Sequence, residues 1–195
     1  MGGGAPRELV MTMPDPAKSR ETERFALVPI FQGLGQAEIA RILKITEERT
    51  YEAGSYVFRP GDAVEGFYVI LEGKIEIRSP KTEAGAEIPL ATLSNRSVFG
   101  EMALLANRAR ASAAVAIDRT RVMVVPKKDF DAMLAAGDVS AYKIVHAFAK
   151  IIGQRLRRTE DELIGLVREM GFDKQQKKLA ELQQFRQKLF SEWSF

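Results

Sequence analysis

One stretch of sixteen residues, Phe99–Ala114, constrains this chain more than any other. It runs Phe-Gly-Glu-Met-Ala-Leu-Leu-Ala-Asn-Arg-Ala-Arg-Ala-Ser-Ala-Ala. A glycine permits backbone conformations and close approaches that a side chain obstructs, and the apolar residues after Gly100 predict a helical turn over 102–105. The first amides of a helix lack partners within it and, together with the helix dipole, favour an anion. The stretch therefore predicts an anion site that begins at Gly100.

Arg110 and Glu101 give this predicted site its chemical character. A guanidinium group can hold two phosphate oxygens at once, and the small residues 111–113 allow backbone amides to approach a ligand. A carboxylate repels phosphate, so Glu101 needs a different partner, and ribose hydroxyl groups are natural donors to it. The alternative is an ordinary helix start with a solvated arginine and glutamate. Taken together, the residues favour a nucleotide pocket.

The stretch resembles the phosphate-binding cassette of the cyclic-nucleotide-binding domain family. That pattern is Phe-Gly-Glu-(Leu/Met)-Ala-Leu, a few variable residues, then Arg and small residues, and every fixed position is matched. Segments 54–62 and 72–77 also resemble hairpins of the family, so the resemblance spans about residues 25–170. It implies a set of ligand-binding residues: Phe99, Gly100, Glu101, Met102, Ala103, Leu104, Arg110, Ala111, Ser112, Thr159 and Arg155.

The pattern of the chain predicts a mainly β fold with flanking helices. Segment 74–78 alternates charged residues with isoleucine, as a half-buried strand does, and the Pro and Gly of 59–62 indicate a turn. Several such short strands indicate a jelly-roll-like β-roll, followed by a long C-terminal dimerisation helix and a second terminal helix. The segment from Phe25 to Arg49 is expected to be helical. The predicted domains are a flexible arm at 1–24, the β-roll with its N-terminal helix at 25–136, the dimerisation helix at 137–170 and an amphipathic terminal helix at 171–195.

A heptad seam indicates that the chain forms a parallel homodimer through residues 145–170. Apolar residues recur there in steps of four and three, which is the pattern of a two-stranded coiled coil. Thr159 interrupts the seam. In the catabolite activator branch of the family, an Arg-Leu-x-x-Thr stretch of the dimer helix places its Thr on the adenine, and Arg155–Thr159 is similar. The alternative is that Thr159 is a polar seam residue without a ligand.

Several classes of function are disfavoured by what the sequence contains. No apolar run approaches the roughly 20 residues that span a bilayer, and the chain has no cysteine. We therefore expect a cytoplasmic protein without a membrane partner. Walker, dinucleotide-binding and His-Glu-x-x-His motifs are missing from the sequence. The expectation is thus no enzyme, no catalytic residue, no metal and no cofactor.

The resemblance implies a sensor that binds a cyclic nucleotide and signals through its C-terminal helices. In that family a Thr or Ser directly after the cassette arginine favours guanine, and Ala111 at this position implies cAMP rather than cGMP. A cyclic dinucleotide stays open as the ligand. Residues 174–195 are expected to contact a protein partner.

Two alternatives to the sensor stay open. The first is a DNA-binding transcription regulator that uses the basic C-terminal region. Only 25 residues follow position 170, too few for a winged helix-turn-helix, so DNA binding is uncertain. The second is an interaction scaffold without a ligand.

Overall fold

The computed structural model describes residues 25–80, 85–168, 178–181, 183 and 184. The chain divides into two compact units, residues 1–148 and 149–195. The predicted N-terminal arm lies outside the described residues. Of the predicted terminal helix at 171–195, residues 178–181, 183 and 184 are described, and they are helical. Within these ranges, every helix is too short or too polar to cross a bilayer.

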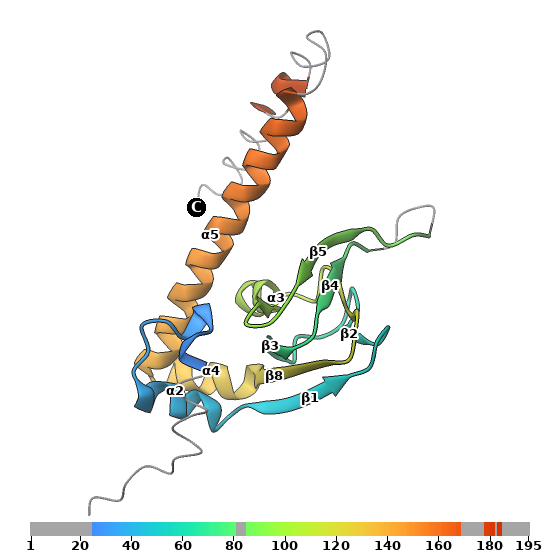
Figure 1. Ribbon diagram of the computed structural model, residues 1–195. Coiled ribbons are helices and arrows are strands. Elements are labelled where there is room, and N and C mark those ends of the chain that lie inside the picture. Colours follow the sequence, from blue (N-terminus) through green and yellow to red (C-terminus); the bar gives the residue numbers. More distant parts are fainter. Residues whose placement is uncertain (1–24, 81–84, 169–177, 182, 185–195) are drawn as a thin grey trace, which may run out of the picture. The chain divides into compact units, whose positions relative to one another are not determined.

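Eight strands in the described part of the first unit form two antiparallel sheets of four strands each (Figure 1). The sheet orders are β1-β8-β3-β6 and β2-β7-β4-β5. This arrangement confirms the predicted β-roll. The strands are β1 (Glu47–Tyr51), β2 (Tyr56–Phe58), β3 (Gly66–Glu72), β4 (Ile75–Arg78), β5 (Pro89–Leu93), β6 (Val98–Phe99), β7 (Ala113–Ala116) and β8 (Thr120–Pro126).

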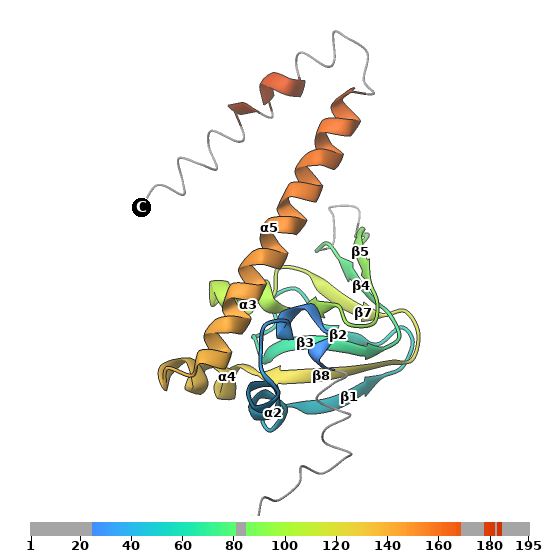
Figure 2. The same ribbon diagram turned by 60° about the vertical axis from the view of Figure 1, so that its left-hand side comes forward.

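Helices precede and follow the strands in the sequence. Figure 2 shows α2 near β1 and α4 at the end of β8. The long α5 confirms the predicted C-terminal helix. The bounds are η1, a 3-10 turn (Pro29–Phe31), α2 (Gln36–Leu43), α3 (Glu101–Ala106), α4 (Lys127–Ala135) and α5 (Val139–Arg168).

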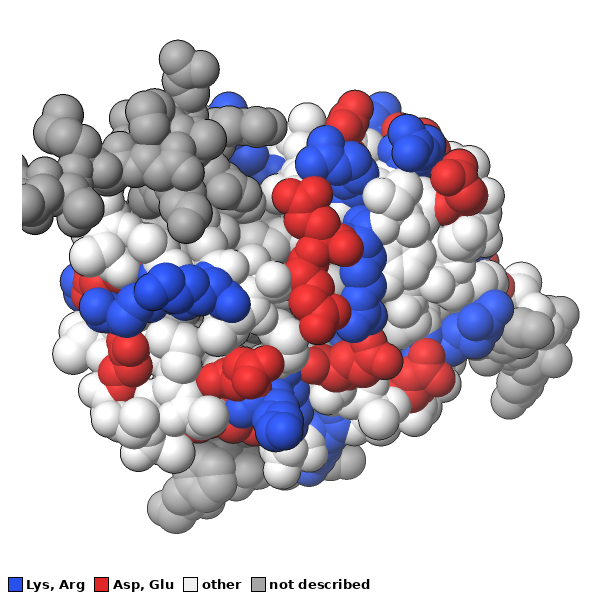
Figure 3. Space-filling model, turned by 90° about the horizontal axis from the view of Figure 1, so that it is seen from below, with Lys and Arg blue, Asp and Glu red and all other residues white. Residues whose placement is uncertain are grey.

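The expectation of one helical segment from Phe25 to Arg49 was wrong. A 3-10 turn and α2 occupy its first part, separated at Gly33, whose φ of 91° lies in the left-handed region. Its last part is β1, which pairs with β8 so that Glu47 lies opposite Val124. The charged residues of β1 suit a strand because they pair with neighbours: Arg121 of β8 contacts Glu48 at 2.9 Å. Figure 3 shows acidic and basic side chains next to one another across this face.

The hydrophobic core lies between the two sheets and continues on the outer side of β3. Tyr68, Ile70 and Phe99 pack between the sheets. On the other side of β3, the Phe67 ring contacts those of Phe130 and Phe148, with centroids 5.4 and 5.0 Å apart. Burial of both sides explains why β3 is a continuous apolar run rather than an alternating one.

Helix α5 begins at a capped junction rather than continuing from α4. Gly137, with a φ of 71°, follows the end of α4. The Asp138 carboxylate then accepts a hydrogen bond of 2.7 Å from the Ser140 backbone N–H, which is an N-cap. Arg41 of α2 forms an ion pair with Asp138 at 3.3 Å and donates to the Ser140 hydroxyl at 2.9 Å. The start of α5 is thus tied to α2.

We predict that Phe67→Ala lowers the free energy of unfolding by about 3–5 kcal/mol, because it leaves a cavity beneath two aromatic rings. Urea denaturation measures the change. Leu90→Ala is the matched control, since Leu90 on β5 is 61% exposed, and it should change the free energy by less than about 0.5 kcal/mol. A loss below about 1 kcal/mol in Phe67→Ala would contradict the described packing.

A second prediction concerns the cap of α5 and its pH dependence. Hydrogen bonds from Ser140 and the charge of Arg41 hold the pKa of Asp138 below its usual 3.8. The stabilisation is therefore present above the unfolded pKa and is lost as pH falls through the lower folded pKa. Asp138→Ala should cost about 1–2 kcal/mol at neutral pH, and less at about pH 3. Urea denaturation at both pH values is the measurement, and an equal deficit at both would refute the assignment.

Candidate functional site

The predicted turn and helix of the anion site lie between β6 and β7. Gly100 follows β6 with a φ of 80°, and α3 begins at the next residue. A Cβ at Gly100 would lie 2.8 Å from the Nη1 atom of Arg110, so the position excludes any side chain. Asn107, with a φ of 48°, ends α3 as a left-handed cap. The predicted turn over 102–105 lies inside this helix.

Arg110 is buried in the wall of the β-roll, where it is 3% exposed. Its Nη1 group donates to the Gly100 carbonyl at 2.6 Å, and its Nη2 group donates to the Gly66 carbonyl at 2.7 Å. The guanidinium carbon lies 4.3 Å from the ring centroid of Phe58 and 5.6 Å from that of Tyr68. Two carbonyls and an aromatic face therefore fix the orientation of the guanidinium.

The positive charge of Arg110 is incompletely compensated. Its Nε atom is buried and has no hydrogen-bond partner among the described residues. Burial lowers the pKa of Arg110, and interactions with Tyr68, Glu65 and Glu101 act in the opposite direction. An arginine stays protonated in proteins, so the site presents a fixed cation. Burying a cation that is held mainly by neutral carbonyls costs free energy, and a bound anion would offset that cost.

A second motif joins the cassette at Arg110. The turn predicted over Arg59–Asp62 is closed by a hydrogen bond of 2.7 Å from the Arg59 N–H to the Asp62 carboxylate. Backbone bonds then connect this turn to Arg110: the Gly61 N–H donates to the Arg110 carbonyl at 2.8 Å, and the Arg110 N–H donates to that of Asp62 at 3.0 Å. Two segments that are about fifty residues apart in the chain thus position one arginine.

The remaining cassette residues take different environments. Glu101, the first residue of α3, is 1% exposed, and Leu104 and Phe99 are also buried. Met102 is 63% exposed, whereas Ala103 and Ser112 are half-buried and Ala111 is exposed. A buried carboxyl group at the start of a helix is favoured by the helix dipole.

Arg155 and Thr159 belong to the second unit, on α5. Both are exposed. The Thr159 hydroxyl donates to the Arg155 carbonyl at 3.1 Å, which satisfies its proton inside the helix. The hydroxyl therefore has a hydrogen-bond acceptor even without a nucleotide. Its contact with adenine remains a prediction from the resemblance.

Sequence reasoning missed three residues that hold Arg110, namely Phe58, Tyr68 and Gly66. Phe58 and Tyr68 look like ordinary core residues of two strands, and no local signal places them under an arginine. The need for glycine at position 66 is visible only in the structure, where a Cβ would lie 2.1 Å from the Val125 carbonyl oxygen. The close approach of β3 and β8 therefore requires glycine at the position whose carbonyl accepts from Arg110.

Comparison with known proteins agrees with this geometry. A family model described as the cyclic nucleotide-binding domain matches residues 48–136. The chain is 30% identical over 135 residues to the cyclic AMP receptor protein of Thermus thermophilus, covering 69% of this chain and 60% of that one. It is 41% identical over 107 residues to a cAMP-dependent protein kinase regulatory subunit of Mycosarcoma maydis, covering 53% of this chain and 20% of that one.

Solved structures show the same fold. The catabolite activator protein of Thermus thermophilus aligns with a TM-score of 0.61 at 30% identity, over 71% of this chain and 62% of that one. The chain thus spans less than two thirds of the length of each of these three proteins. Residues 48–136, which include the cassette and all or part of every strand, thus belong to the cyclic nucleotide-binding domain family.

Proposed function

We propose that the cassette binds cAMP and that Arg110 holds its cyclic phosphate. The observation that carries this proposal is the buried guanidinium, which is fixed by two carbonyls and an aromatic face and leaves Nε unpaired among the described residues. The cyclic phosphate carries one negative charge, which would neutralise the positive charge of this guanidinium. A charge-assisted contact of this kind is stronger than one between neutral groups.

The cassette offers complementary groups for the rest of the nucleotide. The amides of Met102, Ala103 and Leu104 at the start of α3 are assigned to the phosphate, and Glu101 to the ribose 2′-hydroxyl. Phe99, Gly100, Ala111 and Ser112 supply the close backbone approach. Two relatives are named for cAMP, and Ala111 lacks the hydroxyl that favours guanine, so cAMP is preferred over cGMP or a cyclic dinucleotide.

The proposal includes a homodimer that signals through its C-terminal helices in the cytoplasm. Leu156 and Leu163 of the second unit are 48% and 43% exposed in the single chain, and a coiled-coil partner would cover them. Thr159 and Arg155 are assigned to the base. Nucleotide binding would shift the population of two arrangements of the helices, provided that it contacts one better than the other. The partner assigned to residues 174–195 is a protein.

We predict that Arg110→Ala weakens cAMP binding at least about tenfold, because it removes a charge-assisted contact worth about 1.5–3 kcal/mol. Arg110→Lys should also weaken it, since an ammonium group cannot replace the two-pronged geometry. Isothermal titration calorimetry measures the affinity, and thermal melts confirm that each variant is folded. Arg119→Ala is the control, because this side chain is 72% exposed and pairs with Glu52. Wild-type affinity in both Arg110 variants would remove the proposed site.

A separate prediction tests the dimer. Leu163→Lys places a charge in the proposed seam and should shift the protein from dimer to monomer in sedimentation velocity. Asp161→Lys introduces the same side chain at an exposed position outside the seam, and it should leave the dimer intact. A monomeric wild-type protein, or equal behaviour of the two variants, would exclude this dimer interface.

A further inference from the structure

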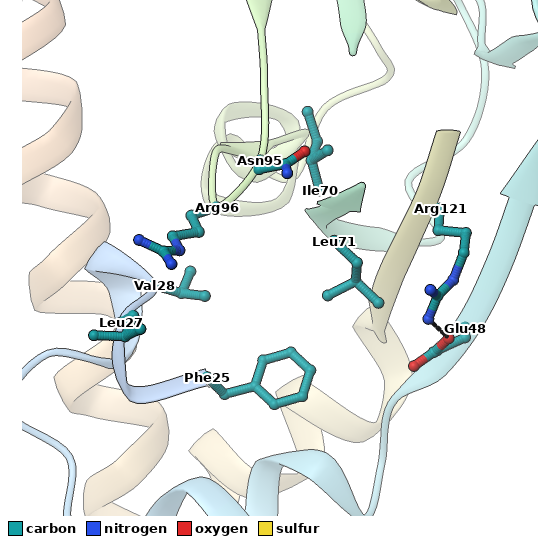
Figure 4. Close-up of a pocket in the computed structure, with 9 residues that line it drawn as sticks. All are labelled: Phe25, Leu27, Val28, Glu48, Ile70, Leu71, Asn95, Arg96 and Arg121. Atoms are coloured by element: carbon teal, nitrogen blue, oxygen red, sulfur yellow. Dashed lines mark hydrogen bonds and ion pairs between the residues drawn. The ribbon is translucent and has the colours of Figure 1, made fainter. Parts of the chain in front are cut away.

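A pocket of about 210 Å³ opens on the first unit (Figure 4). Nine residues line it, and none of them belongs to the cassette. They come from the segment before η1, from β1, β3 and β8, and from the turn between β5 and β6. The pocket is therefore independent of the cyclic-nucleotide site in the residues that form it.

The pocket combines an apolar floor with a polar rim. Phe25, Val28 and Leu71 form the floor; the first two are 7% and 3% exposed, and Leu71 is half-buried. On one side of the rim, Arg121 is already neutralised by Glu48 at 2.9 Å and Glu72 at 3.4 Å. Arg121 and its two glutamates together carry a net charge of −1, so this side of the rim offers no cation to a ligand.

The other side of the rim carries Arg96, whose charge is not neutralised. Its guanidinium forms no ion pair with any residue in the described ranges. Figure 4 shows this side chain extending from the turn toward Leu27 and Val28. The pocket thus presents one available cation at the edge of an apolar surface.

The backbone at Arg96 adopts a left-handed conformation that is costly for a residue with a side chain. The Ser97 N–H donates to the Ser94 carbonyl at 2.9 Å, which closes a tight turn, and Arg96 has a φ of 68° within it. Glycine or asparagine suits this position, and a side chain there carries a conformational cost. The Arg96 N–H donates to the Ile70 carbonyl at 2.8 Å, which fixes the turn against β3. Such strain is a reason to look for a function of the side chain.

We propose that this pocket binds a small apolar monoanion, namely a short-chain or aromatic carboxylate. Its carboxylate would pair with Arg96, and its apolar body would cover Phe25, Val28 and Leu71. The size fits this class, because typical drug-sized ligands occupy about 300–1,000 Å³ and an apolar cavity of about 150 Å³ holds one benzene ring. A nucleotide is too large and too polar for this volume and floor.

The full-length chain, labelled with ¹⁵N, can be titrated with hexanoate and with benzoate and followed by two-dimensional NMR. We expect saturable shifts at Arg96, Val28 and Leu71 with at least one acid. The uncharged analogues 1-hexanol and benzyl alcohol should bind at least about tenfold more weakly, because they lack the charged contact. No saturable shift with either acid, or equal binding of acid and alcohol, would overturn the proposal.

Arg96→Gly separates loss of binding from loss of folding. It removes the cation and relieves the left-handed strain, so the melting temperature should stay the same or rise while the affinity for the acid falls at least about tenfold. Arg119→Ala, at an exposed ion pair outside the pocket, should bind the acid like wild type. Undiminished binding by Arg96→Gly would show that Arg96 is not the anion site. The affinity for cAMP in Arg96→Gly is a separate measurement, which reports on the cassette alone.

Discussion

The burial of the Arg110 guanidinium organises the functional half of this molecule. A buried charge is unfavourable unless polar groups and charges replace the lost water. Here the replacements are carbonyls of Gly100 and Gly66 and the ring of Phe58. Because these groups come from β2, from the start of β3 and from the entry to α3, one side chain depends on the placement of three separate segments.

Two glycines make this arrangement possible, for different reasons. Gly100 adopts a left-handed conformation and lies so close to the guanidinium that a Cβ would meet it. Gly66 has no unusual φ, but its neighbour strand comes so near that a Cβ would collide with a carbonyl oxygen. In both cases the lack of a side chain allows a backbone carbonyl to come within hydrogen-bonding distance of Arg110. The cation is thus held by the backbone through one bond from each Nη group, while its Nε–H has no partner among the described residues.

The sequence predicted the cassette, the β-roll and the long helix, because each depends on local motifs or on periodicity. It failed at β1 and β7 for physical reasons. The residues of β1 are mostly charged and are satisfied by cross-strand partners such as Arg121, a contact invisible to local periodicity. The Ala-rich β7 has no β-branched pattern except Val115, yet it is fully buried between β2 and β4. Phe58 and Tyr68 could be assigned to the core but not to Arg110, since that contact joins segments distant in sequence.

The arginines of the first unit differ in how their charges are neutralised. This difference distinguishes arginines with a structural role from those that could bind a ligand. Arg49 and Arg121 each contact two glutamates on the sheet that contains β1 and β8, and such exposed pairs contribute little to stability. An exposed arginine without a partner is also unremarkable, because water solvates it. Arg110 belongs to neither group, because it is buried without full compensation. Arg96 is exposed, but it differs from other exposed arginines because it is held in a strained turn beside an apolar floor. In each case the chain carries a conformational or desolvation cost to keep a cation in place, and an anionic ligand is the partner that would offset it.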